Sequence, residues 1–167
     1  MADPHRRRPP AQVVREGNPG KRPVREGVKL PPAELVEPKW METFPPVFGD
    51  KGQTEVNRRA REVASTEWRR VVPVLAKTAG LAEVDATALR DYCVCVARLD
   101  QCERDLSRNG LLMVGERGWQ KNGATTIAAQ YRTMLKTYLR EFGLSPSARA
   151  GLAPPPDGDD DGDDAFD

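Results

Sequence analysis

Residues 81–142 read LAEVDATALRDYCVCVARLDQCERDLSRNGLLMVGERGWQKNGATTIAAQYRTMLKTYLREF. This stretch contains two segments in which apolar side chains recur every three or four residues, the spacing typical of an amphipathic helix. The first predicted helix covers residues 83–109, and the second covers residues 124–142. Gly110 and Gly143 follow the two helices, where a residue in left-handed conformation commonly ends a helix. The chain is therefore predicted to be mainly α-helical.

The folded part of this chain is small. Without its two tails the chain keeps about 100 residues for a core, which is marginal for a stable monomer. We therefore expect apolar burial between subunits of a homo-oligomer.

Residues 111–123 connect the two predicted helices. They begin with four apolar residues, and glycines then flank the pair Glu116-Arg117. This pattern predicts a small β-hairpin or an ordered loop. Two short strands are marginally stable on their own in water. We therefore expect them to pack on the helices or to pair between subunits.

Residues 54–79 form another predicted helical region. Thr54 is its expected N-cap, and Pro73 is expected to divide it into one long helix and one short helix. Five arginines make the region basic, and glutamates partly neutralise them: Arg58, Arg59, Arg61, Arg69 and Arg70 with Glu55, Glu62 and Glu67. The mixture favours a solvated helix face with many ion pairs over a helix that reads DNA.

Composition divides the chain into four predicted regions. They are a basic flexible arm (residues 1–30), a Pro-rich linker (31–52), a helical oligomerisation core (53–152) and an acidic disordered tail (153–167). Aromatic residues such as Trp40 in the linker are expected to hold it against a neighbouring domain. A contact with another subunit and base stacking by Trp40 are the alternatives.

The net charge of +1 hides a strong segregation of charge. Residues 1–29 hold eight Lys or Arg and three acidic residues, whereas residues 154–167 hold seven Asp and no basic residue. Basic residues on an arm gain affinity for nucleic acid by releasing counterions from phosphates. The predicted DNA-binding residues are Arg6, Arg7, Arg8, Arg15, Lys21, Arg22, Arg25 and Lys29. A solvated leader without a partner is the alternative.

The acidic tail has three open interpretations. It is a hook for a basic partner, a solubilising end, or a competitor of DNA for the basic arm.

Several function classes have no support in the sequence. The one histidine is His5, in the arm, and no paired carboxylates fall in a predicted cleft, so we predict a protein that is not an enzyme. Cys93, Cys95 and Cys102 share one predicted helix and are expected to be apolar fillers, so no metal and no cofactor are predicted. No apolar run approaches the roughly 20 residues of a membrane span.

A series of short motifs follows in order along residues 15–152. They are Gly17-Asn18-Pro19-Gly20-Lys21-Arg22-Pro23, the run from Trp68 to Leu75, Gly80-Leu81, Asp85 with Leu89, Tyr92-Cys93, Arg98, Lys121-Asn122, and the run from Phe142 to Arg149. In this order they resemble one branch of the phage terminase small subunits. The chain departs from that pattern at Ala82, where the family usually has Thr, and at Gly123, where it usually has Pro.

The resemblance implies a fold, a function and partners. Small terminase subunits are mainly helical, form ring-shaped homo-oligomers, bind the viral genome near its packaging start and present it to the large subunit. The large subunit carries the ATPase and nuclease activities. For this chain, the resemblance implies double-stranded viral DNA, the large terminase subunit and further copies of itself as partners, in the cytoplasm of the host cell. It also implies that the two long helices supply the ring interfaces, and the predicted oligomer-interface residues are Leu89, Tyr92, Val96, Leu99, Tyr131, Leu135 and Tyr138.

Two other classes of function stay open. The first is a helix-turn-helix regulator, whose recognition helix would follow Gly80-Leu81-Ala82. Asp85 and Asp91 near the start of that helix would repel phosphate. The second is an assembly scaffold that does not bind DNA.

Overall fold

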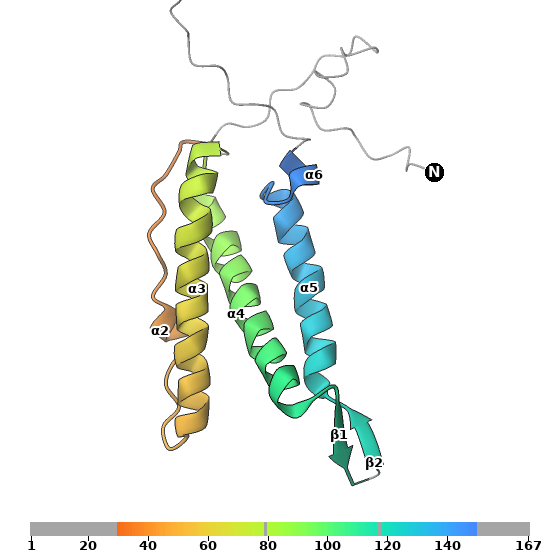
Figure 1. Cartoon of the computed structure of the whole chain (residues 1–167). Helices are drawn as coiled ribbons and strands as arrows, with labels where there is room; N and C mark the ends of the chain where they lie inside the picture. Colours follow the sequence, from red (N-terminus) through yellow and green to blue (C-terminus); the bar gives the residue numbers. More distant parts are fainter. Residues whose placement is uncertain (1–29, 79, 117, 150–167) are drawn as a thin grey trace, which may run out of the picture.

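The computed structural model describes residues 30–78, 80–116 and 118–149 (Figure 1). Within these residues the elements are α2 (Trp40–Thr43), α3 (Lys51–Thr78), a 3-10 turn (Glu83–Asp85), α4 (Ala86–Asn109), β1 (Leu112–Gly115), β2 (Gly118–Lys121), α5 (Gly123–Glu141) and α6 (Pro146–Arg149). The predicted fold, mainly helical with a hairpin between two long helices, is confirmed. The ring is still a prediction.

The helices α3, α4 and α5 lie side by side, with α4 in the middle (Figure 1). The buried positions of α4 include Leu89, Tyr92, Cys93 and Ala97, which repeat at the helical spacing and join one core cluster with α3. Complete burial of a side chain the size of Leu89 contributes roughly 1.5–3 kcal/mol. α4 is therefore the element that holds the other two long helices together.

The start of α3 differs from the prediction. The helix begins at Lys51, and the carboxylate of Asp50 accepts a hydrogen bond of 2.8 Å from the backbone N–H of Gln53. The hydroxyl of Thr54 instead bonds to both the N–H and the C=O of Val47, at 3.0 Å each. The predicted N-cap at Thr54 is therefore wrong, because this side chain fastens the incoming loop while Asp50 caps the helix.

Pro73 lies inside α3 and does not divide it, so the predicted division into two helices is wrong. The ring of Pro73 is on the exposed side of the helix. Val71 and Leu75 on either side of it are 2% and 3% exposed and belong to the same core cluster. Packing of both residues therefore stabilises the helix across the one backbone hydrogen bond that proline removes.

The Pro-rich segment lies against α3, as its aromatic residues predicted. Trp40 and Phe44 are buried, and the ring of Trp40 meets the ring of Trp68 edge-on at 6.2 Å. The carboxylate of Glu37 accepts hydrogen bonds from the indole of Trp40, the hydroxyl of Ser65 and the guanidinium of Arg69. Burial alone would raise the pKa of Glu37, but these donors outweigh it and lower the pKa below its ordinary value.

A buried acidic side chain joins α3 to α4. Glu67 is 9% exposed, and its carboxylate accepts hydrogen bonds from the hydroxyl of Tyr92 and from the guanidinium of Arg70. Burial alone would raise the pKa of Glu67, yet the bonds from Arg70 and Tyr92 lower it overall. Burial, and then the bond to Glu67, raise the pKa of Tyr92. Glu67 is therefore ionised, and Tyr92 is its neutral donor, near neutral pH.

Asn122 joins three elements where α4, the hairpin and α5 meet. Its side-chain oxygen accepts a hydrogen bond of 2.9 Å from the N–H of Ala124, which caps α5. Its amide nitrogen donates to the carboxylate of Asp105 at 2.9 Å and to the carbonyl of Gly110 at 3.0 Å. Gly110 has a φ of 82° and ends α4 as predicted. Every hydrogen-bonding atom of this buried amide side chain thus has a partner.

The strands β1 and β2 form an antiparallel hairpin in which Val114 pairs with Trp119. The hairpin extends beyond the ends of α4 and α5 (Figure 1), so its side chains are exposed. Val114 and Trp119 are 74% and 73% exposed. The predicted hairpin is confirmed, but the strands do not bury their side chains on the helices of the same chain. Pairing between subunits is still a prediction.

The end of α5 follows a Schellman arrangement. Gly143 has a φ of 65°, and the N–H of Leu144 donates to the carbonyl of Leu139 at 2.8 Å. The hydroxyl of Ser145 then accepts a hydrogen bond of 3.2 Å from the N–H of Ala148 at the start of α6. The predicted stop at Gly143 is confirmed, and the short helix α6 follows Ser145.

The three cysteines are buried and unlinked. Burial raises the pKa of each thiol, and that of Cys93 reaches about 12, so these thiols are protonated at neutral pH. Among the described residues, no group of His, Cys, Asp and Glu could hold a metal ion. In the same residues, no helix combines the length and the apolar character needed to cross a bilayer.

Candidate nucleic-acid interface

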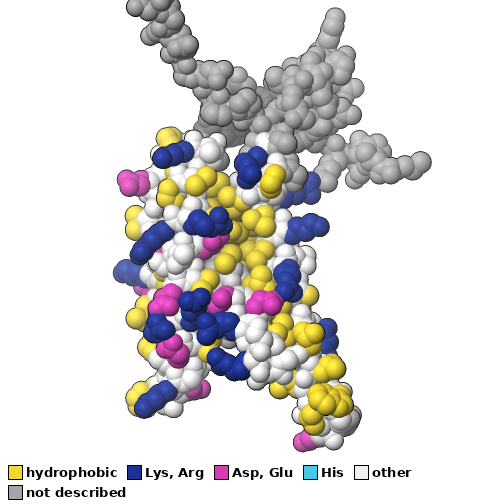
Figure 2. Space-filling view, in the orientation of Figure 1, with side chains coloured by type: hydrophobic (Ala, Val, Ile, Leu, Met, Phe, Trp, Pro, Cys, Tyr) yellow, Lys and Arg dark blue, Asp and Glu magenta, His cyan; other side chains and the backbone are white. Residues whose placement is uncertain are grey.

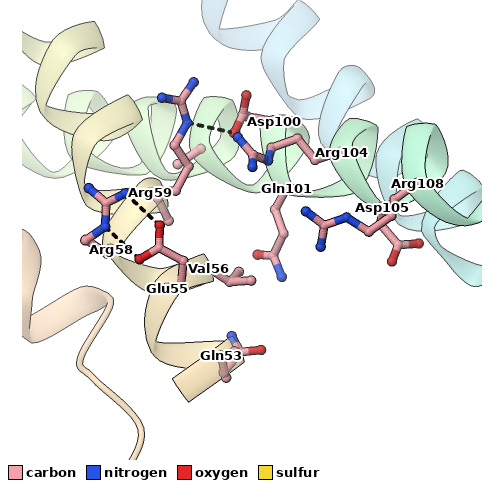
Figure 3. A pocket seen from close by; sticks show the side chains of 13 residues that line it. Gln53, Glu55, Val56, Arg58, Arg59, Asp100, Gln101, Arg104, Asp105 and Arg108 are labelled. Atoms are coloured by element: carbon pink, nitrogen blue, oxygen red, sulfur yellow. Dashed lines mark hydrogen bonds and ion pairs between the residues drawn. The ribbon is translucent and has the colours of Figure 1, made fainter. Parts of the chain in front are cut away.

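A groove of about 480 Å³ lies between the first half of α3 and the second half of α4 (Figure 3). Four arginines line it, Arg58 and Arg59 from α3 with Arg104 and Arg108 from α4; we call it the arginine groove. Glu55, Asp100 and Asp105 also line it, so the cationic side chains exceed the carboxylates by one. Its charge is therefore close to balanced, with the excess positive.

The two arginines of α3 are held in ion pairs. Arg58 makes a two-pronged pair with Glu55, at 2.6 and 2.8 Å (Figure 3), and a second pair with Glu62. Arg59 lies 3.7 Å from the carboxylate of Asp100 on α4. The hydrogen bond from Arg58 lowers the pKa of Glu55. This side of the groove is the ion-paired helix face that the sequence favours.

The two arginines of α4 are available to an anion. Arg104 and Arg108 are exposed and lie four residues apart, so they share one side of the helix and extend toward the groove (Figure 3). Among the described residues neither has an ion pair within 4.0 Å. Guanidinium groups spaced in this way suit successive phosphate oxygens of a nucleic-acid backbone. The groove can therefore add phosphate contacts but offers no base-reading helix.

A family model described as "Phage terminase, small subunit" matches residues 64–159, more than half of the 167-residue chain. The chain belongs to this family. No curated protein and no solved structure matches it. The match begins within α3 and includes α4, the hairpin, α5 and α6. The Gly-Asn-Pro-Gly-Lys-Arg-Pro motif at residues 17–23 lies outside the matched region.

Membership of the terminase small subunit family implies a role in phage DNA packaging. Members of the family are generally non-catalytic DNA-binding subunits that associate with DNA and with a large subunit.

The predicted DNA-binding residues of this family member all lie outside the described residues. They are Arg6, Arg7, Arg8, Arg15, Lys21, Arg22, Arg25 and Lys29, and their contact with DNA is still a prediction. Arg104 and Arg108 were not among them. The sequence does contain a signal for these two arginines, because they are spaced four residues apart on the polar side of a predicted helix. The other wall of the groove comes from residues about fifty positions earlier, which no local spacing reveals.

The predicted interface residues divide into two groups. Leu89 and Tyr92 are 0% and 2% exposed, and the ring of Tyr92 meets that of Tyr138 in the same chain edge-on at 6.2 Å. The other five are half-buried: Val96, Leu99, Tyr131, Leu135 and Tyr138. Leu89 and Tyr92 thus belong to the core within one chain. The half-buried residues keep surface for a partner, and their place in a subunit interface is still a prediction.

Two alternatives lose support from the geometry. Trp40 is 6% exposed, so its ring faces are covered by protein and cannot stack on a base. The segment between α3 and α4 contains a 3-10 turn, and α4 runs back along α3 with its apolar side buried (Figure 1). A helix-turn-helix motif instead crosses its helices at about 90–120° and leaves the second free to enter a groove.

Proposed function

We propose that this chain binds double-stranded viral DNA as a closed homo-oligomer and presents the DNA to the large terminase subunit in the host cytoplasm. The observation that carries the proposal is the family match over residues 64–159. In this proposal the small subunit has no catalytic role, and the large subunit supplies the ATPase and nuclease activities.

The surface left open by the single chain supports oligomerisation. Apolar side chains gather between α3 and α5 and on the hairpin (Figure 2). Exposed apolar residues on α5 and the hairpin include Ile127, Met134, Leu112, Val114 and Trp119. Exposed apolar side chains that gather in one place are typical of protein interfaces. A two-stranded hairpin is also marginal alone, so a contact with another subunit would stabilise it.

We expect the purified chain to sediment as a closed oligomer. Replacing Trp119 with Lys should shift it toward smaller species, because a charge then replaces an indole at the contact. Met41→Lys is the matched control, since Met41 is an exposed apolar residue on α2, away from the hairpin and α5. Analytical ultracentrifugation across a concentration series measures both variants. A wild-type chain that stays monomeric at the highest concentration would contradict the oligomer.

Two sets of cations support DNA binding. The arm of residues 1–29 holds eight Lys or Arg, and the arginine groove adds Arg104 and Arg108. Each phosphate that a cation neutralises steepens the dependence of log K on log salt by about 0.9 for duplex DNA. The slope of this salt dependence therefore measures the number of phosphate contacts. Variants show whether those contacts belong to the arm or to the groove.

Deleting residues 1–29 is expected to flatten the salt dependence of DNA binding strongly, because most of the proposed phosphate contacts are lost. Arg104→Ala with Arg108→Ala is expected to lower the slope by at most about 2 for each subunit that contacts the DNA. Fluorescence anisotropy with a duplex from the phage genome, between 50 and 300 mM salt, measures both slopes. Lys39→Ala with Lys77→Ala is the control, since these exposed lysines lie outside both sets. Unchanged binding after the deletion would exclude the arm as the contact.

A further inference from the structure

A second groove, of about 620 Å³, runs along α5 and reaches α6. We call it the α5–α6 groove. Its apolar lining comes from Leu135, Leu139 and Ala148, and its cations are Arg132, Lys136 and Arg140. The three cations are spaced four residues apart and so follow one side of α5. No carboxylate lines this groove, in contrast to the nearly balanced arginine groove.

The three cations of the α5–α6 groove differ in whether they form an ion pair with a described carboxylate. Arg132 pairs with Glu103 of α4. Among the described residues, Lys136 and Arg140 have no carboxylate within 4.0 Å. An apolar floor beside unpaired cations is complementary to an acidic peptide that also carries an apolar side chain.

The sequence of this chain contains such a peptide. Residues 157–167 read DGDDDGDDAFD, with seven aspartates around a single aromatic residue, Phe166. The peptide follows Arg149, the last described residue, which is adjacent to Ala148 in the groove. Phe166 is 17 residues after Arg149, a length that spans up to about 55–60 Å when extended. The residues of α5 that line the groove extend over only about 12 Å of helix.

We propose that residues 157–167 bind in the α5–α6 groove of their own chain. Phe166 packs on Leu135 and Leu139, and the aspartates face Lys136 and Arg140. A short tether gives the tail a local concentration on the order of millimolar, so modest affinity is enough to fill the groove. The bound tail covers cations that would otherwise attract DNA. Docking of the tail does not depend on DNA binding by the chain, whereas its regulatory effect rests on the proposed function.

The test places a photoreactive benzoylphenylalanine at position 166 of the full chain and maps its crosslinks by mass spectrometry. We expect most crosslinks to fall on residues 132–148. Lys136→Glu with Arg140→Glu should reduce them at least fivefold, because the two reversed charges repel the aspartates. Lys39→Glu with Lys77→Glu makes the same change of charge away from the groove and should leave the crosslinks unchanged. Circular dichroism of each variant confirms that the helices are intact.

Three outcomes would overturn the proposal. Crosslinks spread over the whole surface would show that the tail has no preferred site. Equal losses in both double variants would show that only overall charge holds the tail. In an equimolar mixture of ¹⁴N- and ¹⁵N-labelled chains, crosslinks within one chain join only like labels, so a mixed-label share of about half would show that the tail binds a neighbour rather than its own chain. None of these outcomes bears on DNA binding, so failure of this proposal is distinct from failure of the proposed function.

Discussion

Replacing Asn122 with Ala is expected to lower the free energy of unfolding by about 3 kcal/mol. The loss of the cap on Ala124 costs about 0.5–2 kcal/mol. The carbonyl of Gly110 and the carboxylate of Asp105 also lose a donor in a partly buried site, which costs about 1–3 kcal/mol. For a folded part of this size, the combined loss lowers the melting temperature by roughly 10–20 °C.

Asn109→Ala is the matched control for this prediction. The amide of Asn109 also donates to the carboxylate of Asp105, at 2.8 Å, but its side chain is exposed and caps no other helix. We expect its loss to change stability by no more than about 0.5 kcal/mol. Urea denaturation at one fixed protein concentration compares the variants, because association changes apparent stability. Equal effects from Asn109 and Asn122 would contradict the role of Asn122 as the joint of three elements.

Replacing Glu67 with Gln is expected to cost about 2–3 kcal/mol at pH 7, because Arg70 and the buried hydroxyl of Tyr92 lose a charged acceptor. The effect depends on pH with a definite sign. The pKa of Glu67 is lowered in the folded chain, so its contribution is fully present above the ordinary value of 4.5. It is lost as pH falls through the lowered pKa of the folded state.

Chemical denaturation of both proteins between pH 3 and pH 7 measures this difference. The stabilities of wild type and Glu67→Gln should converge as the pH falls below about 4.5. Glu62→Gln is the control, since Glu62 is also on α3 and paired with an arginine but is exposed. An exposed pair contributes about 0–1 kcal/mol. Parallel curves for wild type and Glu67→Gln at all pH values would contradict the assignment of an ionised, buried Glu67.

Local sequence patterns predicted most of the helices and the hairpin. The positions of Gly110 and Gly143 predicted the ends of α4 and α5, because a positive φ favours glycine there. Two local rules gave wrong answers. Thr54 lost the capping position to Asp50, and Pro73 stayed within α3 because Val71 and Leu75 pack on the core. The first error arises within the loop that leads into α3, where Thr54 bonds to Val47, and the second arises because packing on the core outweighs local preference.

The candidate sites were less predictable than the fold. The arginine groove needs residues of α3 and α4 that lie far apart in sequence, so no motif contains it. Likewise, the apolar spacing of α4 could not separate fully buried positions from half-buried ones. Leu89 and Tyr92 share one stripe with Val96 and Leu99, but contacts within the chain bury only the first two.

The central claim, that this chain joins viral DNA to the large terminase subunit, is tested most directly by a three-component capture assay. A linear fragment of the phage genome is immobilised, and retention of the purified large subunit is measured at about 150 mM salt with and without the full chain. The proposed function predicts that the chain increases retention several-fold and that the chain without residues 1–29 does not. Equal retention of the large subunit in the presence and absence of the chain would contradict it.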